Sequence, residues 1–379
     1  MTRDPFDVPL ARLRERTSAK WRHFAPDVLP LWIAEMDVEL AEPIQEALFR
    51  AVRDGDLGYP GSTPYAESFV AFADARWDWP DLDAGRIIPV QSVILGYVDA
   101  LIEHTDPGSA VIVNSPVYPP FYSYLIQADR EVIEAPLDAD LRLDPAAIEA
   151  AMTRATAGGR RAAYLLCNPH NPGGTAHTRA ELEALAGLSH RHGVPVVSDE
   201  IHGPIVHAGH QFVPYLTVDP TAVALHAASK AFNLAAMPAA LLVGGADSAP
   251  TLDRFRAGKH HGPGHLGVIA QSAAYREGGA WLDAMLAGLE RNRFLTRDLL
   301  AEHAPGVRYT VPEATYLTWL DFGDACGEDP AAVLLERGRV ALNRGLDFGM
   351  GGAGHARLNI ATSPAILEEA ARRIGAALA

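Results

Sequence analysis

Short, mainly apolar runs alternate with amphipathic stretches through the middle of the chain, and this alternation restricts the fold more than any other feature. Each run is bounded by Asn, Asp, Ser or Gly. Apolar runs of this length are typical of strands buried on both faces, as in a parallel sheet covered by helices. The sequence therefore predicts an α/β fold with a mostly parallel sheet flanked by helices. The predicted strands are Ala110–Asn114, Ala162–Cys167, Val194–Ser198, Val223–Ala227 and Ala240–Val243.

The helical stretches between these runs carry their own start and stop signals. Asp144 precedes Pro145, which is the arrangement of an N-cap followed by proline at the first helical position. Thr178 and Glu181 have the spacing of a capping box, and that helical pattern stops at Gly193. Two helices are thus predicted on either side of the second apolar run.

The pattern changes near residue 281, where a long helix is predicted to join a second strand-and-helix unit. A chain of 379 residues is long enough for two domains at roughly 100–200 residues each. We expect an N-terminal arm or part of the small domain at 1–45, a large cofactor-binding domain at 46–285 and a small C-terminal domain at 286–379.

Charge and cysteine content exclude several classes of protein. The net charge of −15 opposes binding to phosphate backbones and anionic membranes, so we expect no nucleic-acid or membrane partner. Two cysteines cannot form a disulfide framework or a four-thiolate metal site. The first 20 residues lack the apolar core of a signal peptide, which favours a cytoplasmic protein.

Polar groups follow three of the predicted strands at the point where each one ends. An asparagine-containing turn, Asn168–Gly174, follows one strand, Asp199 follows the next, and Lys230 follows the third. In an open parallel sheet, ligands bind beyond the carboxyl ends of the strands. We therefore expect these groups to converge on one site.

Lysine is rare in this chain, which makes each one informative. Of 32 basic residues only Lys20, Lys230 and Lys259 are lysines. Arginine serves for a general positive charge, so a retained lysine can mark a place that needs a primary amine. The three groups that follow the strands suit pyridoxal phosphate. The lysine amine can hold its aldehyde, the carboxylate of Asp199 can lie beside its pyridine nitrogen, and the asparagine-containing turn can place a donor near its phenolic oxygen.

The sequence resembles the fold-type I pyridoxal-phosphate enzymes of aminotransferase class I/II along nearly its whole length. A closer similarity is to their cystathionine β-lyase (MalY/PatB-like) branch. The segments that carry the broader resemblance are Asn168–Gly174, Ser198–His202 and Ser229–Asn233, and those that carry the closer one are Leu31–Asp37, Leu57–Pro60, Ser115–Tyr122, Glu313–Leu320 and Ala356–Asn359.

The resemblance implies a role for each matching residue. Lys230 would hold the cofactor covalently and act as acid and base, Asp199 would hold the pyridinium, and Tyr118 would stack on the ring. Asn171 and His202 would lie at the phenolic oxygen. The phosphate would be bound by the start of a predicted helix and by the serine before the lysine, namely Gln91, Ser92, Val93 and Ser229.

Further residues are implied in substrate binding and assembly. Arg357 would hold the substrate carboxylate with its two-pronged guanidinium, and Trp32, Tyr122 and Arg344 are further candidates for substrate contact. Tyr59 would reach the phosphate of a neighbouring subunit, which implies a homodimer.

Two phosphate anchors common in the family are absent. Ala227 stands where a serine usually binds phosphate, and Asn233–Pro238 lacks the usual basic residue. His226 or a nearby arginine is a candidate to compensate. Two glycine-rich matches to a dinucleotide loop do not lie between a strand and a helix, and the histidine groups at 202–210 and 260–265 lack metal-ligand spacing, so no metal is expected.

The function expected is a pyridoxal-phosphate-dependent C–S β-lyase that cleaves L-cystathionine or a related cysteine S-conjugate to a thiol, pyruvate and ammonia. Transamination is the main alternative, followed by a specialised biosynthetic reaction on an amino-acid conjugate. A regulatory protein and a dehydrogenase are less well supported, because the candidate chemical groups are intact and no dinucleotide loop is present.

Overall fold

The computed structural model describes residues 4–61, 64–257 and 262–379, so Lys259, His260 and His261 lie outside the described residues. Its larger sheet has the strand order β2-β8-β7-β6-β5-β3-β4. Strands β7, β6, β5, β3 and β4 pair in parallel, whereas β8 is antiparallel to both neighbours. The strands are β2 (Ile87–Val90), β3 (Ala110–Val113), β4 (Glu131–Glu134), β5 (Ala162–Cys167), β6 (Val196–Asp199), β7 (Val223–His226) and β8 (Ala240–Gly244).

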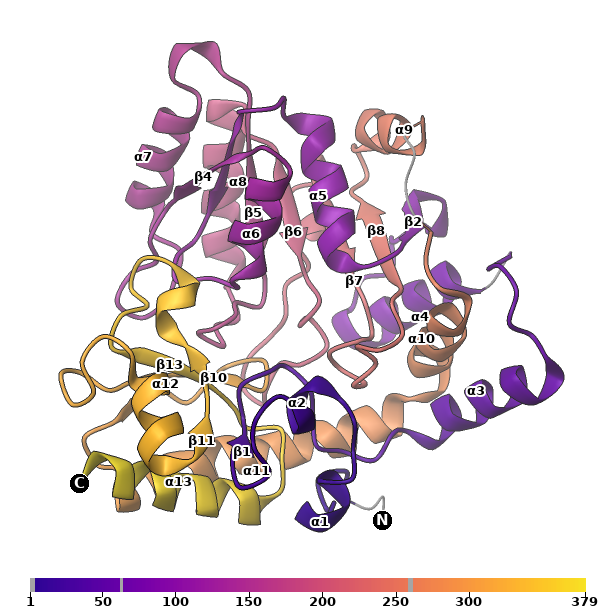
Figure 1. The fold of residues 1–379 in the computed structure, drawn as a ribbon. Coiled ribbons are helices and arrows are strands. Elements are labelled where there is room, and N and C mark those ends of the chain that lie inside the picture. The colour runs from indigo at the N-terminus through magenta and orange to yellow at the C-terminus, as the bar shows by residue number, and fades with distance from the viewer. Residues whose placement is uncertain (1–3, 62–63, 258–261) are drawn as a thin grey trace.

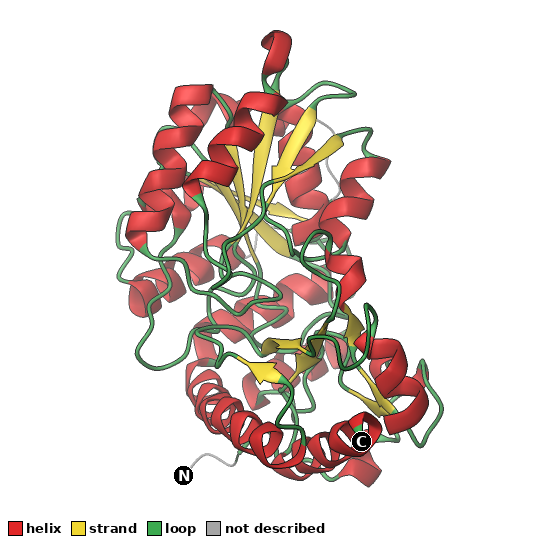
Figure 2. Cartoon of the chain, turned by 90° about the vertical axis from the view of Figure 1, so that its left-hand side faces the viewer, coloured by secondary structure: helices red, strands yellow, loops and turns green. Residues whose placement is uncertain are grey.

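Helices cover both faces of this sheet, as Figures 1 and 2 show. One face is packed by α5 (Val93–His104), α6 (Pro120–Gln127) and α9 (Ala249–Ala257). The other face is packed by α4 (Tyr65–Trp77), α7 (Pro145–Ala155), α8 (Arg179–His192) and α10 (His265–Glu277). The expected α/β fold with a mostly parallel sheet is confirmed.

Strand β5 shows why a strand of this sheet has an uninterrupted run of mainly apolar residues. Successive side chains of a strand point to opposite faces. Tyr164 and Leu166 accordingly join the apolar cluster on one face, while Leu165 and Cys167 join the cluster on the other. Every residue of β5 is buried. Apolar residues are therefore needed on both faces of the strand, and the sequence does not alternate between apolar and polar residues.

The start and stop signals of the predicted helices are also confirmed. The Asp144 carboxylate accepts from the backbone amides of Ala146 and Ala147 at the start of α7. Thr178 and Glu181 form the reciprocal capping box of α8, and Gly193 ends this helix with a φ of +63°. A left-handed C-cap of this kind favours glycine.

A smaller antiparallel sheet lies below the larger one in Figure 1 and has the order β12-β13-β10-β9. The long helix α11 (Gly279–His303) packs against the C-terminal helix α13 (Pro364–Leu378) beneath it. The other elements of this region are β9 (Arg308–Tyr309), β10 (Leu317–Asp321), α12 (Pro330–Val333), the π-helical turn Leu334–Gly338, β12 (Asn343–Arg344), the 3-10 turn Gly345–Phe348 and β13 (His355–Asn359).

The N-terminal arm packs against the smaller sheet region. Its strand β1 (Leu29–Pro30) pairs in parallel with β11 (Val340–Ala341). Before it lie the short helices α1 (Leu10–Leu13) and α2 (Ala19–Arg22), and after it comes α3 (Glu42–Asp54). The remaining 3-10 turns are Ala84–Arg86, Ala157–Gly159 and Tyr215–Thr217.

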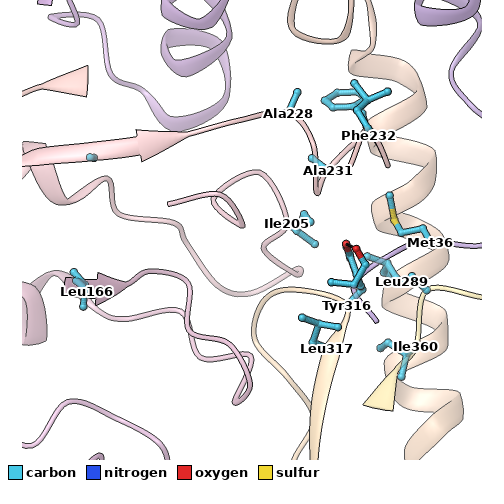
Figure 3. Close-up of a cluster of buried hydrophobic side chains, with 14 of the residues drawn as sticks. Met36, Leu166, Ile205, Ala228, Ala231, Phe232, Leu289, Tyr316, Leu317 and Ile360 are labelled. Atoms are coloured by element: carbon cyan, nitrogen blue, oxygen red, sulfur yellow. Dashed lines mark hydrogen bonds between the residues drawn. The ribbon is translucent and has the colours of Figure 1, made fainter. Parts of the chain in front are cut away.

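Apolar packing joins the arm, the two sheets and α11 into a continuous core, part of which is drawn in Figure 3. Met36 of the arm, Phe232 beyond β7, Leu289 of α11 and Leu317 of β10 are all fully buried in this cluster or nearly so. Among the described helices, none is long and apolar enough to cross a membrane.

Candidate active site

Three adjacent parallel strands bring the predicted polar groups to one pocket. Strands β5, β6 and β7 are neighbours, and their carboxyl ends lead to Asn171, Asp199 and Lys230 respectively. The three side chains line a pocket of about 160 Å³. Its other polar lining residues are Ser92, Tyr118, Cys167, His202 and Ser229.

Asp199 is a buried carboxyl with little to stabilise its charge. Burial raises the pKa of Asp199 to about 7, against the smaller opposing effects of the Ile201 amide and of Lys230. The Ile201 amide nitrogen donates to Asp199 Oδ1 at 3.1 Å. A cationic donor, such as a protonated pyridine nitrogen, would stabilise the ionised form of this carboxyl.

Lys230 is the amine of the pocket. Burial, followed by the charge of Arg357, lowers its pKa to about 8, and Asp199 opposes this shift. The amine donates to the backbone carbonyl of Ala34 at 3.3 Å. A lysine with a lowered pKa has a larger neutral fraction near neutral pH, which is the form that attacks a carbonyl or takes a proton.

Arg357 on β13 enters the same region from the smaller sheet. One guanidinium nitrogen donates to Asn171 Oδ1 at 2.9 Å, and the other donates to the Trp32 carbonyl at 3.0 Å and Asn343 Oδ1 at 2.8 Å. No carboxylate of the described residues forms an ion pair with it. Its charge is therefore oriented by neutral oxygens and is available to an anionic ligand.

Aromatic and imidazole groups complete the wall. Burial raises the pKa of Tyr118 to about 12, with Arg357 opposing the shift. His202 is buried and its pKa is held well below the usual range by burial and by Lys230 and Arg357. Its Nδ1 atom finds no hydrogen-bond partner within the described parts of the chain. His202 is thus a neutral group that can share a proton with a bound ligand.

The start of α5 lies at one end of the pocket. Ser92 is its N-cap, and the Ser92 hydroxyl accepts from the Leu95 amide at 3.2 Å. Ser92 and Val93 line the pocket together with Ser229, and Gln91 directly precedes the N-cap. Free amides and the helix dipole at such a start favour a phosphate. Apart from Lys230, the described lining contains no lysine or arginine.

Several predicted site residues have partners away from this pocket. The Tyr122 hydroxyl lies 2.6 Å from Glu134 Oε1 and 3.0 Å from the Phe348 carbonyl, between α6 and the turn before β13. Arg344 is half-exposed and pairs with Asp329 at 2.8 Å. The roles proposed for these two residues in substrate contact remain predictions.

Trp32, Tyr59 and His226 also have defined positions. The Trp32 ring lies 5.1 Å from the His23 ring, while its carbonyl holds Arg357. Tyr59 is 98% exposed in the single chain. His226 lies 3.2 Å from the buried Glu200 carboxylate. It is absent from the pocket lining, so its suggested role in phosphate binding remains a prediction.

Sequence reasoning missed the contribution of backbone carbonyls. Those of Trp32 and Ala34 hold Arg357 and Lys230, and the Ala34 carbonyl also accepts from Tyr316 at 3.2 Å. A carbonyl is the same in every residue and leaves no residue-type pattern. The Leu31–Asp37 segment, which contains both residues, was the available signal, through its resemblance to the family.

The residues present fit pyridoxal phosphate. Lys230 can hold its aldehyde, Asp199 can satisfy the pyridine nitrogen, and the phosphate can lie at the start of α5. The unpartnered Nδ1 atom of His202 and the uncompensated carboxyl of Asp199 are the observations that favour a polar aromatic ligand here.

Comparisons with known proteins agree with this geometry. The family model for aminotransferase class I and II matches residues 95–374. A Mycobacterium leprae protein with the provisional name cystathionine beta-lyase is 49% identical over 100% of this chain and 99% of its own length. Cystathionine beta-lyase PatB of Bacillus subtilis is 34% identical over 93% of each chain.

A similar solved structure is that of a Corynebacterium diphtheriae protein with the provisional name PLP-dependent beta-cystathionase. It is 32% identical, covers 98% of each chain and superposes with a TM-score of 0.89. Sequence and fold therefore point to the same group of proteins.

Proposed function

This chain belongs to the aminotransferase class I and II family, and on that basis we propose that it is a pyridoxal-phosphate-dependent C–S β-lyase. Its substrate is L-cystathionine or a related cysteine S-conjugate, and its products are a thiol, pyruvate and ammonia. The observation that supports this most directly is that Lys230 and Asp199 line one pocket while Arg357 binds Asn171 in the wall of that pocket.

The reaction requires the substrate to be held by its carboxylate. Arg357 offers a guanidinium whose position is fixed by Asn171, Asn343 and the Trp32 carbonyl. A bidentate contact with the carboxylate orients the Cα–H bond toward Lys230. The contact between Arg357 and the substrate carboxylate contributes to orientation as well as to binding. Weakening this contact is therefore expected to raise KM and to lower the rate of proton removal.

Lys230 then acts as the base at Cα and as a proton donor to sulfur, a role that Tyr118 can share. When bound, pyridoxal phosphate supplies an electron sink for the pair left at Cα, and Asp199 keeps it protonated for that purpose. The Cα–H and Cβ–S bonds break, the sulfur leaves with its electron pair and takes a proton, and water releases pyruvate and ammonia. The partial burial of Lys230 limits the access of bulk water to the transferred proton.

The direct test is release of pyruvate and free thiol from L-cystathionine with no 2-oxo acid added. We expect the two products in equal amounts, and we expect Lys230→Ala to abolish both. Turnover that depends on an added 2-oxo acid and releases no thiol would instead identify an aminotransferase. The absence of both reactions in protein that holds pyridoxal phosphate would favour a specialised conjugate as substrate.

We also propose that the enzyme is a cytoplasmic homodimer. Apolar side chains that are more than half exposed gather on α3 and in the segment after it. Their exposed fractions are 70% for Phe49, 58% for Val52, 56% for Leu57 and 98% for Tyr59. A cluster of this kind on a single chain is typical of a subunit interface. Tyr59 would be the residue that reaches the partner's cofactor.

A further inference from the structure

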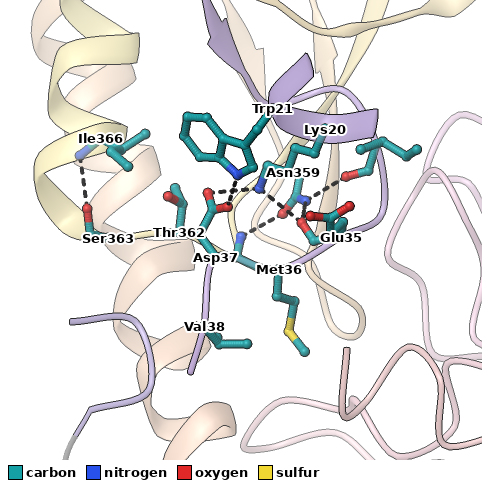
Figure 4. A network of polar contacts seen from close by, with 12 residues as sticks. Lys20, Trp21, Glu35, Met36, Asp37, Val38, Asn359, Thr362, Ser363 and Ile366 are labelled. Atoms are coloured by element: carbon teal, nitrogen blue, oxygen red, sulfur yellow. Dashed lines mark hydrogen bonds and ion pairs between the residues drawn. The ribbon is translucent and has the colours of Figure 1, made fainter. Parts of the chain in front are cut away.

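Lys20, which the proposed mechanism does not use, is completely buried beside the active site. Its amine lies 2.8 Å from Asp37 Oδ2 and donates to the Glu35 carbonyl at 3.0 Å. The other oxygen of Asp37 accepts from the Trp21 indole nitrogen at 3.0 Å. Figure 4 shows this network between the arm and the strand that ends at Asn359. Lys20 is one of only three lysines in the chain.

A buried ion pair of this kind is poor evidence for stability in itself. Removing two charges from water is costly, and the attraction within the pair together with its extra hydrogen bonds mainly offsets that cost. Such a pair instead discriminates strongly between positions of the chain, because a shift of the backbone leaves a buried charge unpaired. Lys20 and Asp37 therefore restrict where the segment immediately before Asp37 can lie.

That segment, residues 32–36, hereafter the strap, is bound along both of its edges. The carbonyls of Ile33 and Glu35 accept from Asn359 Nδ2, each at 2.8 Å. On the other edge, Asn233 Nδ2 donates to the Met36 carbonyl at 3.1 Å, and Asn233 Oδ1 accepts from the Met36 amide at 2.8 Å. Within the strap the chain bends at Ile33 and Ala34, where the Glu35 amide donates to the Ile33 carbonyl at 2.8 Å.

Two other carbonyls of the strap reach the cations of the active site. The Trp32 carbonyl accepts from Arg357, and the Ala34 carbonyl accepts from Lys230. A neutral carbonyl can orient a cation without cancelling its charge, whereas a carboxylate would compete with the substrate for it. The position of the strap thus sets the direction of Arg357 and of the Lys230 amine.

We propose that the Lys20–Asp37 pair is a lock that holds the strap in register and thereby positions Arg357 and Lys230. Both members of the pair are positioning residues, since neither lines the pocket. The catalytic roles of Arg357 and Lys230 rest on the proposed function, whereas the contacts that position them do not depend on it. Lysine suits this place because its compact amine fits between Asp37 and the Glu35 carbonyl, where the larger planar guanidinium of arginine would have to displace the strap.

The test compares a double variant with a matched control. Lys20→Met with Asp37→Asn removes both charges and leaves an acceptor for Trp21. The control, Arg12→Met with Glu39→Gln, removes an exposed ion pair of 2.9 Å from the same arm. L-alanine binding is measured by the absorbance of bound pyridoxal phosphate. We expect the lock variant to bind L-alanine about tenfold more weakly and to shift the pH midpoint of that absorbance. The control should change neither.

Hydrogen exchange supplies a readout that does not depend on the reaction. Amides of the strap should exchange at least tenfold faster in the lock variant, both with and without pyridoxal phosphate, while the strands β5 and β6 keep their protection. Unchanged exchange and unchanged L-alanine binding would overturn the proposal. A wild-type protein that binds L-alanine but does not cleave cystathionine would contradict the proposed function and leave this test intact.

A variant that keeps the charge provides a second route should the double variant fail to fold. Lys20→Arg retains the ion pair but replaces a compact amine by a planar guanidinium. The proposal predicts weaker L-alanine binding and faster exchange in the strap for this variant as well. Wild-type values for both in folded Lys20→Arg protein would overturn the claim that the position of the strap requires the compact amine of lysine.

Discussion

At the scale of single residues, this site holds ionisable groups in places that disfavour their charged forms. Asp199 and Arg357 are buried and Lys230 is half-buried, and desolvation is the largest contribution to the pKa shift of each. Such groups cost stability in the chain without its ligand, and that cost is recovered when a ligand of matching charge binds. The residues that perform the chemistry are thus the ones that destabilise the empty fold.

Asp199→Asn should therefore stabilise the cofactor-free chain at alkaline pH while it abolishes catalysis. In the unfolded chain the carboxyl titrates near its ordinary pKa of 3.8, whereas in the folded chain its pKa is about 7. The folded state binds the proton more tightly, so the free energy of unfolding falls as the pH rises from about 4 to about 7. Asparagine does not ionise, and the expected gain above pH 7 is on the order of 1–4 kcal/mol.

Urea unfolding of the two cofactor-free proteins at pH 5 and pH 8 measures this difference. The advantage of the variant should be large at pH 8 and smaller at pH 5. An equal difference at both values would mean that the Asp199 carboxyl does not titrate in this range.

At the scale of secondary structure, the helices and strands derive their ends from local signals and their mutual positions from packing. The capping box of α8 is a local signal, because Thr178 and Glu181 are three residues apart and bind each other's backbone and side chain, although Glu181 also pairs with Arg142 at 3.1 Å. The antiparallel direction of β8 is a packing result, since its short apolar run fits either direction. This strand was predicted, but its orientation was not.

Thr178→Ala should lower the free energy of unfolding by about 1 kcal/mol, because it removes the side-chain acceptor for the Glu181 amide. Thr178 does not line the pocket that contains Lys230, so KM and kcat should stay unchanged. Thermal or urea unfolding at neutral pH provides the measurement. Thr178→Ser keeps the acceptor and should be close to the wild type, and a change in KM in Thr178→Ala would show that α8 influences the site.

At the scale of the whole molecule, the smaller sheet and the arm complete a site that the larger sheet begins. Lys230 and Asp199 come from the larger sheet, Arg357 comes from β13, and the strap comes from the arm. Because these parts meet at the pocket, a change in their relative position alters substrate binding directly. The exposed apolar surface of α3 is the proposed dimer interface, so the position of a second subunit is expected to affect the site in the same way.

Phe49→Glu should convert the proposed dimer into folded monomers, because a charge in an apolar interface is left without a partner. Phe49 is 70% exposed in the single chain, so the substitution has little effect on the folding of the subunit itself. Sedimentation velocity measures the change, and loss of pyridoxal phosphate from the monomer would follow if Tyr59 acts across the interface. Ile126→Glu, at a position on α6 that is 65% exposed, is the matched control. A monomeric wild-type protein would contradict the proposal.

Much of the fold and the centre of the site were determined by the sequence alone. The apolar runs and capping signals predicted the strands and helices, and the groups after β5, β6 and β7 predicted the pocket. These inferences succeed because they depend on residue type and local spacing, and because parallel strands end at the same edge of a sheet.

Only the tertiary structure decided how the cations of the site are held. The partners of Lys230 and Arg357 include the backbone carbonyls of Ala34 and Trp32, nearly 200 residues or more distant in the chain. The Lys20–Asp37 pair that fixes those carbonyls looks like two ordinary surface charges until the arm is folded over the smaller sheet. Carbonyls are identical in every residue, and the pairing of distant segments depends on packing of the whole chain, so neither could be found from residue patterns.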